Sequence, residues 1–173
     1  MKEWNLVEIM RHVRHDWLNR LQLIKGYTAL GNSEKVNEII NQIIHYAEQE
    51  TKLSNLSLNK LATLLMTFNW EPHTYELHYE VEGNKSLSSV DDEKITKWLF
   101  KFFQIIDKSA QVNMENELHI KISVDGEEPS FFIEFYGILK DIDEIESFLH
   151  KQTGYFKTVN MNLSQESLSF MLK

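Results

Sequence analysis

Apolar residues in the N-terminal part of the chain recur with the period of an α-helix. Between residues 2 and 30 they follow one another in steps of three or four and form a seam along one side of a helix; they are Leu6, Met10, Val13, Trp17, Leu21 and Ile24. Residues 34–53 repeat this pattern, with the pairs Ile39-Ile40 and Ile43-Ile44. Gly31-Asn32-Ser33 between them offers a C-cap glycine and two N-cap candidates, so the pattern predicts an antiparallel helical hairpin.

The apolar stripes of this hairpin are too broad for two helices to bury by packing only on each other. A second copy of the hairpin would cover them, since two hairpins form a four-helix bundle. We therefore predict that residues 1–56 dimerise and that the protein is a homodimer. The alternative is a monomer in which the hairpin packs against the C-terminal part of its own chain.

A segment rich in Ser and Asn, residues 50–60, marks a domain boundary and leaves residues 57–173 as a second domain. Its hydrophobic pattern changes between the period of a helix and that of a strand. We expect helices at residues 58–68, 91–110 and 142–151, and strands at 75–81, 118–124, 130–136, 157–163 and 167–172. This order predicts an α+β fold, a sandwich of helices on one face of a mostly antiparallel sheet. The acidic run Asp91-Asp92-Glu93 opens a helix and is expected to cap it.

Composition excludes several classes of function. The formal net charge is −8 and the Lys and Arg residues form no basic stripe, which argues against nucleic acid as a partner. The chain has no cysteine, so it has neither disulfides nor cysteine-ligated metals. No apolar run approaches the ~18 residues of a membrane-spanning helix, and the first residues lack the apolar core of a signal peptide. We expect a cytoplasmic protein that does not bind membranes.

One histidine of the first helix lies away from the apolar seam. At about 100° per residue, His15 falls near 160° from Trp17, opposite the seam. The side chains on this face are polar, and the face flattens at a glycine; its members are Glu8, Arg11, His12, Asn19, Gln22 and Gly26. A histidine on such a face does not fill a core. Periodicity alone leaves open that it is an ordinary solvated histidine without a function.

The residues around His15 resemble a known motif. Arg14-His15-Asp16-Trp17-Leu18-Asn19, followed by Leu21-Gln22-Leu23-Ile24-Lys25-Gly26, looks like the phosphoacceptor helix of two-component systems in its Arg-His-Asp-x-x-Asn form. It is most similar to the sporulation initiation phosphotransferase B family of bacilli, and Lys52-Leu53-Ser54-Asn55-Leu56 and Thr67-Phe68-Asn69-Trp70 extend the likeness. The resemblance implies that His15 is phosphorylated. It also implies a phosphorelay, in which phosphate passes from the aspartate of one response-regulator receiver domain through His15 to the aspartate of a second, a transcription factor that starts sporulation.

The chemistry of the neighbouring side chains suits such a transfer. A neutral imidazole can attack an acyl phosphate and hold a phosphoramidate of similar transfer potential. The moving phosphoryl group needs compensation of its charge, for which Arg11, one turn earlier on the same face, is the candidate. Asn19, one turn later, can donate a hydrogen bond to an incoming oxygen. Asp16 is rotated about 100° from His15 and could orient the ring only by reaching sideways; in the family the neighbouring acid aids transfer from ATP.

The second domain resembles the ATP-binding domain of histidine kinases but departs from it in its motifs. Ile105-Ile106-Asp107-Lys108-Ser109-Ala110 is similar to the kinase pattern Leu-x-Asp-Asn-Ala, with Lys108 in place of the magnesium-binding asparagine. Phe135-Tyr136-Gly137-Ile138 stands in place of an Asp-x-Gly-x-Gly turn, and the six glycines are too scattered for a phosphate loop. We therefore predict a degenerate domain that binds no nucleotide, and no autokinase activity. The chain itself would bind no cofactor, and Mg²⁺ would come with the receiver domain.

Two functions of other classes remain as alternatives. The first is a non-catalytic dimeric interaction module, such as an inhibitor of a histidine kinase, in which His15 is only a contact residue. The second, a histidine-aspartate metal phosphohydrolase, is disfavoured because it needs a further histidine well upstream, and only fourteen residues precede His15. The other histidines show no ligand spacing and are expected to be ordinary surface or packed residues; they are His45, His73, His78, His119 and His150.

Overall fold

The structure, a computed structural model, describes residues 2, 4–126, 128–151 and 155–173. The chain forms two compact units, residues 1–50 and residues 51–173. Each unit is described by itself. None of the helices in the described part of the chain combines the length and the apolar character that a membrane-spanning helix needs.

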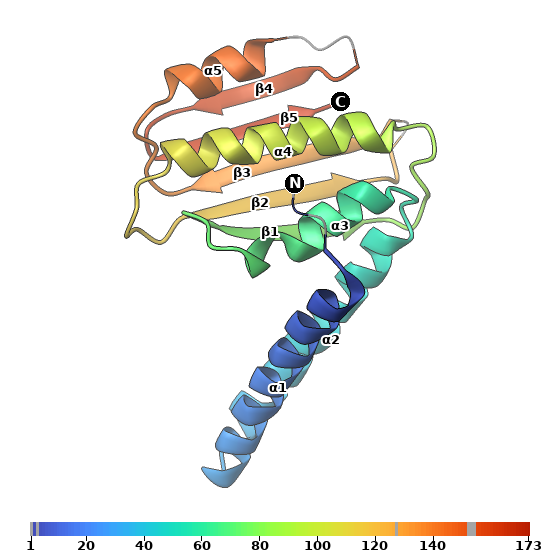
Figure 1. Cartoon of the computed structure of the whole chain (residues 1–173), viewed down its shortest axis with the longest axis vertical. Coiled ribbons are helices and arrows are strands. Elements are labelled where there is room, and N and C mark those ends of the chain that lie inside the picture. Colours follow the sequence, from blue (N-terminus) through green and yellow to red (C-terminus); the bar gives the residue numbers. More distant parts are fainter. Residues whose placement is uncertain (1, 3, 127, 152–154) are drawn as a thin grey trace. The chain divides into compact units, whose positions relative to one another are not determined.

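The N-terminal unit is the predicted helical hairpin. Helix α1 (Leu6–Ala29) and helix α2 (Ser33–Ser54) lie side by side and are joined by a short turn (Figure 1). Asn5 caps α1 through a reciprocal capping box with Glu8, so the helix begins later than the predicted residue 2. Gly31 adopts a φ of +68°, and the Asn32 side chain accepts a hydrogen bond from the Lys35 N–H at 3.1 Å. The turn residues therefore act as the sequence predicts.

Much of the apolar surface of the hairpin stays exposed in the single chain. No residue of α1, all of which the structure describes, is buried, and Leu21 in the middle of the seam is 52% exposed. On α2, Ile40 and Ile44 are exposed as well. A contact between the helices comes from Arg20, whose guanidinium lies 5.4 Å from the centre of the Tyr46 ring. The predicted homodimer stays a prediction, and this open stripe is its physical basis.

The C-terminal unit confirms the predicted α+β fold. Its elements are α3 (Asn59–Thr67), the 3₁₀ helix η1 (Phe68–Trp70), β1 (Glu76–Glu82), α4 (Asp92–Ser109), β2 (Glu117–Ser123), β3 (Ser130–Tyr136), α5 (Asp143–His150), β4 (Thr158–Leu163) and β5 (Ser167–Leu172). The strand order is β1-β2-β3-β5-β4; β1 and β2 are parallel and the other pairs antiparallel. Helices α3, α4 and α5 cover one face of the sheet (Figure 1).

The core of this unit lies between the sheet and its helices. Alternate residues of each central strand are buried, as in β3 with Phe131, Ile133 and Phe135. Helix α4 faces them with Leu99, Phe102 and Ile106, which are fully buried. Leu53 in the last turn of α2 and Leu56 belong to the same core. The core thus begins inside the segment 50–60, three residues before the predicted boundary at residue 56.

The acidic run at the start of α4 caps helices, as predicted, and joins two of them. Asp91 accepts a hydrogen bond from the Lys94 N–H and is the N-cap of α4. Asp92 accepts hydrogen bonds from the N–H groups of Lys60 and Leu61, at 2.8 and 3.0 Å, and so caps α3 as well. These backbone hydrogen bonds hold the first turns of α3 and α4 together.

Candidate functional site

His15 lies in the middle of α1 with its side chain 70% exposed. The reason is local, because the seam residues on both sides of it keep the helical spacing that turns position 15 away from them. A ring in this position can be reached by a large partner from solvent. This exposure meets the first requirement for a protein-bound nucleophile that acts on another protein.

Two side chains of the same helix converge on one nitrogen of the His15 ring. Asp16 Oδ1 lies 3.2 Å from His15 Nδ1, and Asn19 Nδ2 lies 3.3 Å from the same nitrogen. Only one of these contacts is a hydrogen bond in a given tautomer: an Nδ1–H donates to the Asp16 carboxylate, whereas an unprotonated Nδ1 accepts from the Asn19 amide. The Asp16 side chain thus does reach sideways to the ring. In the tautomer with the proton on Nδ1, the lone pair lies on Nε2.

The other residues predicted for this face include Arg11, His12 and Gly26. Arg11 is exposed one turn earlier, and the structure shows no hydrogen bond or ion pair from it to His15 among the described residues. The His12 ring is half-buried and meets the Trp4 ring edge-on, with 5.1 Å between the ring centres. Around Gly26 a Cβ atom would meet only open space. The face is therefore flat and accessible beyond His15.

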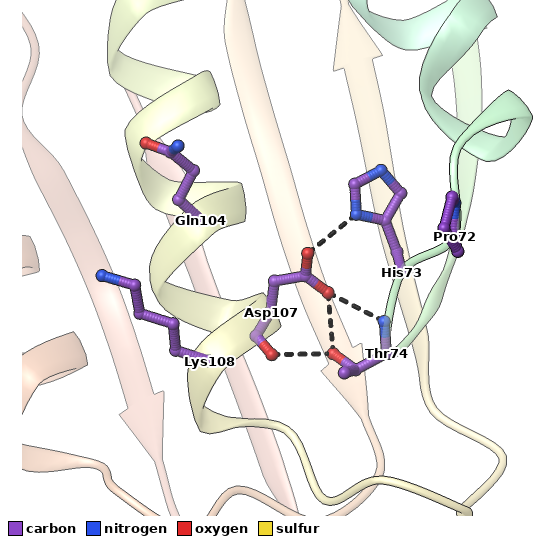
Figure 2. A pocket seen from close by; sticks show the side chains of 6 residues that line it. All are labelled: Pro72, His73, Thr74, Gln104, Asp107 and Lys108. Atoms are coloured by element: carbon purple, nitrogen blue, oxygen red, sulfur yellow. Dashed lines mark hydrogen bonds and ion pairs between the residues drawn. The ribbon is translucent and has the colours of Figure 1, made fainter.

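In the C-terminal unit, Asp107 joins α4 to the segment before β1 (Figure 2). Its carboxylate accepts hydrogen bonds from the Thr74 N–H at 2.8 Å, the Thr74 hydroxyl at 2.9 Å and His73 Nδ1 at 2.8 Å. Partial burial raises the pKa of Asp107, but the hydrogen bonds from Thr74 and His73 outweigh it and hold the pKa below the usual range. Asp107, which lies in the segment similar to the kinase pattern, thus holds the residues before β1 against α4.

A shallow pocket of about 460 Å³ opens beside this network. Its lining residues are Pro72, His73, Thr74, Gln104, Asp107 and Lys108. Figure 2 shows the Asp107 carboxylate turned toward His73 and Thr74, whereas Gln104 and Lys108 extend from α4 in another direction. Lys108 is exposed. The residue that replaces the magnesium-binding asparagine of the kinase pattern therefore brings a cation to the pocket.

Gly137, in place of the kinase glycine turn, also has a structural role. It adopts a φ of +145°, and a Cβ atom there would lie 2.2 Å from the Asn116 side-chain oxygen. Asn116 is 4% exposed, donates to the carbonyls of Thr74 and Gln111, and accepts the Ile138 N–H. The glycine lets this asparagine link the ends of β1, α4 and β3.

The structure brings together three side chains that sequence spacing did not connect. His78 on β1 stands directly opposite His119 on β2, and Glu117 precedes His119 by two positions on the same face. Spacing along the sequence gave no sign of this group, because the parallel register of β1 and β2 supplies the proximity. The expectation that these histidines are ordinary surface or packed residues stays a prediction. A hydrogen bond from the His119 ring lowers the pKa of Glu117 below its usual range. An alternating strand pattern reveals the face of each residue but not its neighbour across the sheet.

Comparison with protein families gives matches over the whole chain. The alpha-helical domain of SpoOB-type sensor kinases matches residues 1–56, and the C-terminal domain of sporulation initiation phospho-transferase B matches residues 57–173. The chain is 36% identical over 154 residues to sporulation initiation phosphotransferase B of Bacillus subtilis (strain 168). That alignment covers 87% of this chain and 78% of the relative.

Solved structures are similar to the chain at low sequence identity. A bacterial phosphotransferase is 11% identical, with a TM-score of 0.43, over 99% of this chain and 98% of its own. The histidine kinase AdeS of Acinetobacter baumannii is 11% identical, with a TM-score of 0.41, over 91% of this chain and 95% of its own. A histidine kinase in complex with a response regulator protein is 12% identical, with a TM-score of 0.44, over 95% of this chain and 60% of its own.

Proposed function

Since the chain belongs to the sporulation initiation phosphotransferase B family, a family of two-component phosphorelay proteins, we propose that it passes a phosphoryl group between two response regulators through a phosphohistidine at His15. The donor is the phosphorylated aspartate of one receiver domain, and the acceptor is the aspartate of a second. The observation that supports this most directly is the exposed His15 ring with its Nδ1 held by Asp16.

The proposed reaction is an in-line exchange at phosphorus. The Nε2 lone pair of His15 forms the N–P bond while the bond between phosphorus and the donor aspartate oxygen breaks and the carboxylate leaves. The ring then carries a positive charge, with the proton still on Nδ1. Asp16, 3.2 Å from that nitrogen, stabilises this charge and keeps Nε2 turned outward. The second transfer reverses these steps, with the acceptor carboxylate as nucleophile.

Two neighbours assist the phosphoryl group itself. Arg11 is exposed on the same face, where its guanidinium can move to the equatorial oxygens once a receiver domain has docked. Asn19 lies one turn after His15, with its amide nitrogen 3.3 Å from Nδ1, and this amide can turn to donate to a phosphoryl oxygen. Both contacts form only in the complex, so they act on the transferring group and not on the resting ring.

The metal for this transfer comes with the receiver domain, whose acidic pocket holds Mg²⁺ beside its aspartate. This chain contributes no cofactor and takes no phosphate from ATP. The use of Asp107 by Thr74 and His73, and a lysine at position 108, support this part of the proposal. A cation replaces a neutral ligand at the position where the kinase pattern binds magnesium.

The working form is a homodimer in which two hairpins make a four-helix bundle. The exposed seam of α1 and the exposed isoleucines of α2 support this, because an apolar stripe of this length is normally covered. A bundle also gives His15 a rigid support, which a transfer between two large proteins requires.

A phosphotransfer assay tests the proposal, with a receiver domain that carries ³²P-labelled phosphate on its aspartate as the donor. Mixed with the full chain, it should transfer label that is stable in base and labile in acid, and His15→Ala should remove that label entirely. His45→Ala is the matched control, since His45 is an exposed histidine of α2 and should leave transfer unchanged. Labelled ATP with Mg²⁺ alone should give no label. No label from any receiver, together with binding to a histidine kinase, would instead support an inhibitory interaction module.

A further inference from the structure

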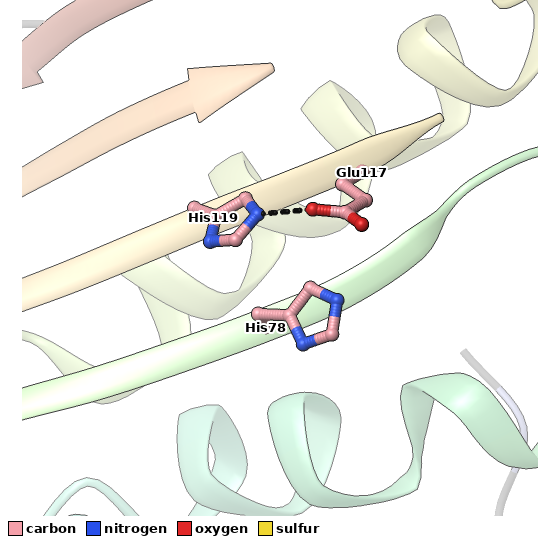
Figure 3. Close-up of side chains that lie close together, drawn as sticks. All are labelled: His78, Glu117 and His119. Atoms are coloured by element: carbon pink, nitrogen blue, oxygen red, sulfur yellow. Dashed lines mark hydrogen bonds and ion pairs between the residues drawn. The ribbon is translucent and has the colours of Figure 1, made fainter. Parts of the chain in front are cut away.

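The imidazoles of His78 and His119 form a pair on the open face of the sheet (Figure 3). β1 and β2 are parallel and in register here, so His78 and His119 are direct partners. Their neighbours Leu77 and Leu118 are buried on the opposite face, which the helices cover. Glu117 points to the same side as His119 because two positions along a strand share a face. Three metal-ligating side chains, two imidazoles and one carboxylate, therefore lie close together.

The distances within this group are short. His119 Nε2 lies 2.8 Å from a Glu117 carboxylate oxygen, and the two imidazole rings stack with 4.8 Å between their centres. One ligand atom from each of the three residues can be chosen so that all lie within 4.8 Å of one another. Glu76, next to the group on β1, approaches His78 Nε2 to 3.9 Å. The imidazoles thus share a site with two carboxylates, whose charge favours a cation.

Solvent can reach the group. The side chains of His78 and His119 are 30% and 41% exposed, and that of Glu117 is 50% exposed. An imidazole ring can offer a nitrogen lone pair to a metal ion, and a carboxylate an oxygen. An ion can therefore enter from solvent and find ligands that need only small rotations.

We propose that His78, Glu117 and His119 bind a divalent transition-metal ion of the Zn²⁺ class. Two imidazoles and one carboxylate are the ligands that zinc prefers, and water or Glu76 completes four-coordination. Tetrahedral ligands at about 2.0–2.1 Å from the ion lie roughly 3.3–3.5 Å apart. The bond between His119 and Glu117 lengthens when the ion replaces the proton that they share, and His78 turns toward it. The ligand chemistry does not suit Mg²⁺ or Ca²⁺, which select oxygen ligands.

Bound metal links the edge strand β1 to β2. Among the strands that the structure describes, β1 is at the edge and pairs with β2, so its attachment depends on one ladder and on the side chains beneath it. An ion held by both strands binds the folded form and not the unfolded chain, and it therefore raises the unfolding temperature. This inference is independent of the role of His15, which belongs to the other unit.

Zinc titration of the full chain tests the site. Isothermal titration calorimetry with ZnCl₂ at pH 7.5 should show a site that weakens at least tenfold in His78→Ala and in His119→Ala. His150→Ala is the matched control, since His150 is an exposed histidine with a backbone hydrogen bond outside the group, and its affinity should be unchanged. MgCl₂ at the same concentration should give no heat at this site.

The unsubstituted chain provides a second readout that needs no variant. In long-range ¹H–¹⁵N spectra of the histidine rings, one equivalent of zinc should shift the ring nitrogens of His78 and His119. The proposal is overturned if zinc shifts only other histidines. It is equally overturned if the double variant His78→Ala/His119→Ala binds zinc as tightly as the unsubstituted chain.

Discussion

The substitution Asp107→Asn removes the negative charge of Asp107 and nearly keeps the shape of its side chain. The carboxylate accepts from the Thr74 N–H at 2.8 Å, the Thr74 hydroxyl at 2.9 Å and His73 Nδ1 at 2.8 Å. Hydrogen bonds to a charged group contribute about 1.5–3 kcal/mol each, and those to neutral groups about 1 kcal/mol. Both Thr74 contacts are made to Asp107 Oδ1, so an asparagine oxygen can keep them, but as bonds to a neutral group. The asparagine amide in place of Oδ2 cannot accept from His73 Nδ1. Because the Asp107 side chain is 30% exposed, we take the low end and expect a loss of about 2 kcal/mol.

Urea unfolding of the full chain at several pH values measures this loss and its origin. The folded-state pKa of Asp107 is depressed, so the aspartate contributes stability that is fully present above its unfolded pKa of ~3.9. That contribution is lost as the pH falls through the folded pKa. The difference in the free energy of unfolding between the unsubstituted chain and Asp107→Asn should therefore be largest near pH 7 and shrink below pH ~4.

An exposed carboxylate nearby provides the control. Glu115 lies in the loop before β2. Glu115→Gln should change the free energy of unfolding by less than about 0.5 kcal/mol both at low pH and near pH 7. The reasoning is wrong if Asp107→Asn also changes stability by less than that amount at pH 7. It is also wrong if the loss is the same at pH 3 and at pH 7, because the charge would then not be its source.

Three further substitutions test other parts of the structure. Gly137→Ala should destabilise the chain by at least about 2 kcal/mol in urea unfolding, because its Cβ would lie 2.2 Å from the Asn116 oxygen at a φ of +145°; stability within 0.5 kcal/mol of the unsubstituted chain would contradict this. Asp16→Asn should slow phosphotransfer to His15 by about tenfold or more in single-turnover assays, since the ring loses its charged partner; an unchanged rate would remove Asp16 from the mechanism. If the chain is the proposed homodimer, Leu21→Glu should convert it to a monomer in light scattering, because the substitution puts a charge into the exposed seam. A dimer that persists would contradict an interface at this seam.

The features that sequence reasoning found are those that depend on neighbours along the chain. The hairpin follows from the spacing of apolar residues and from Gly31, which ends one helix with a positive φ. The strands follow from alternation, as in β3, where every second residue is buried. The cap of α4 by Asp91 lies within one turn of its own helix. For such features, the separation in sequence fixes the separation in space.

The features that sequence reasoning missed depend on pairs of residues that lie far apart along the chain. Asp92 caps α3 across thirty-one and thirty-two positions, and Asp107 holds Thr74 across thirty-three. His78 and His119 become partners only through the register of two parallel strands. Each residue type was visible in the sequence, but its partner was decided by tertiary packing. A single sequence does not contain that register in any local pattern.

His15 was singled out by its likeness to a motif of consecutive residues, and under the proposed function much of its mechanism comes from other molecules. Its two ring contacts, Asp16 and Asn19, lie within one turn of α1, so the helix alone sets their geometry. A single helix cannot surround the phosphoryl group during transfer, and that group needs charge compensation on several sides. The face beyond His15, with open space at Gly26, leaves room for the receiver domain that we propose supplies the metal and the carboxylate. If the proposed function is correct, such a site can serve two different receivers, because the chain provides the nucleophile and each receiver provides the rest.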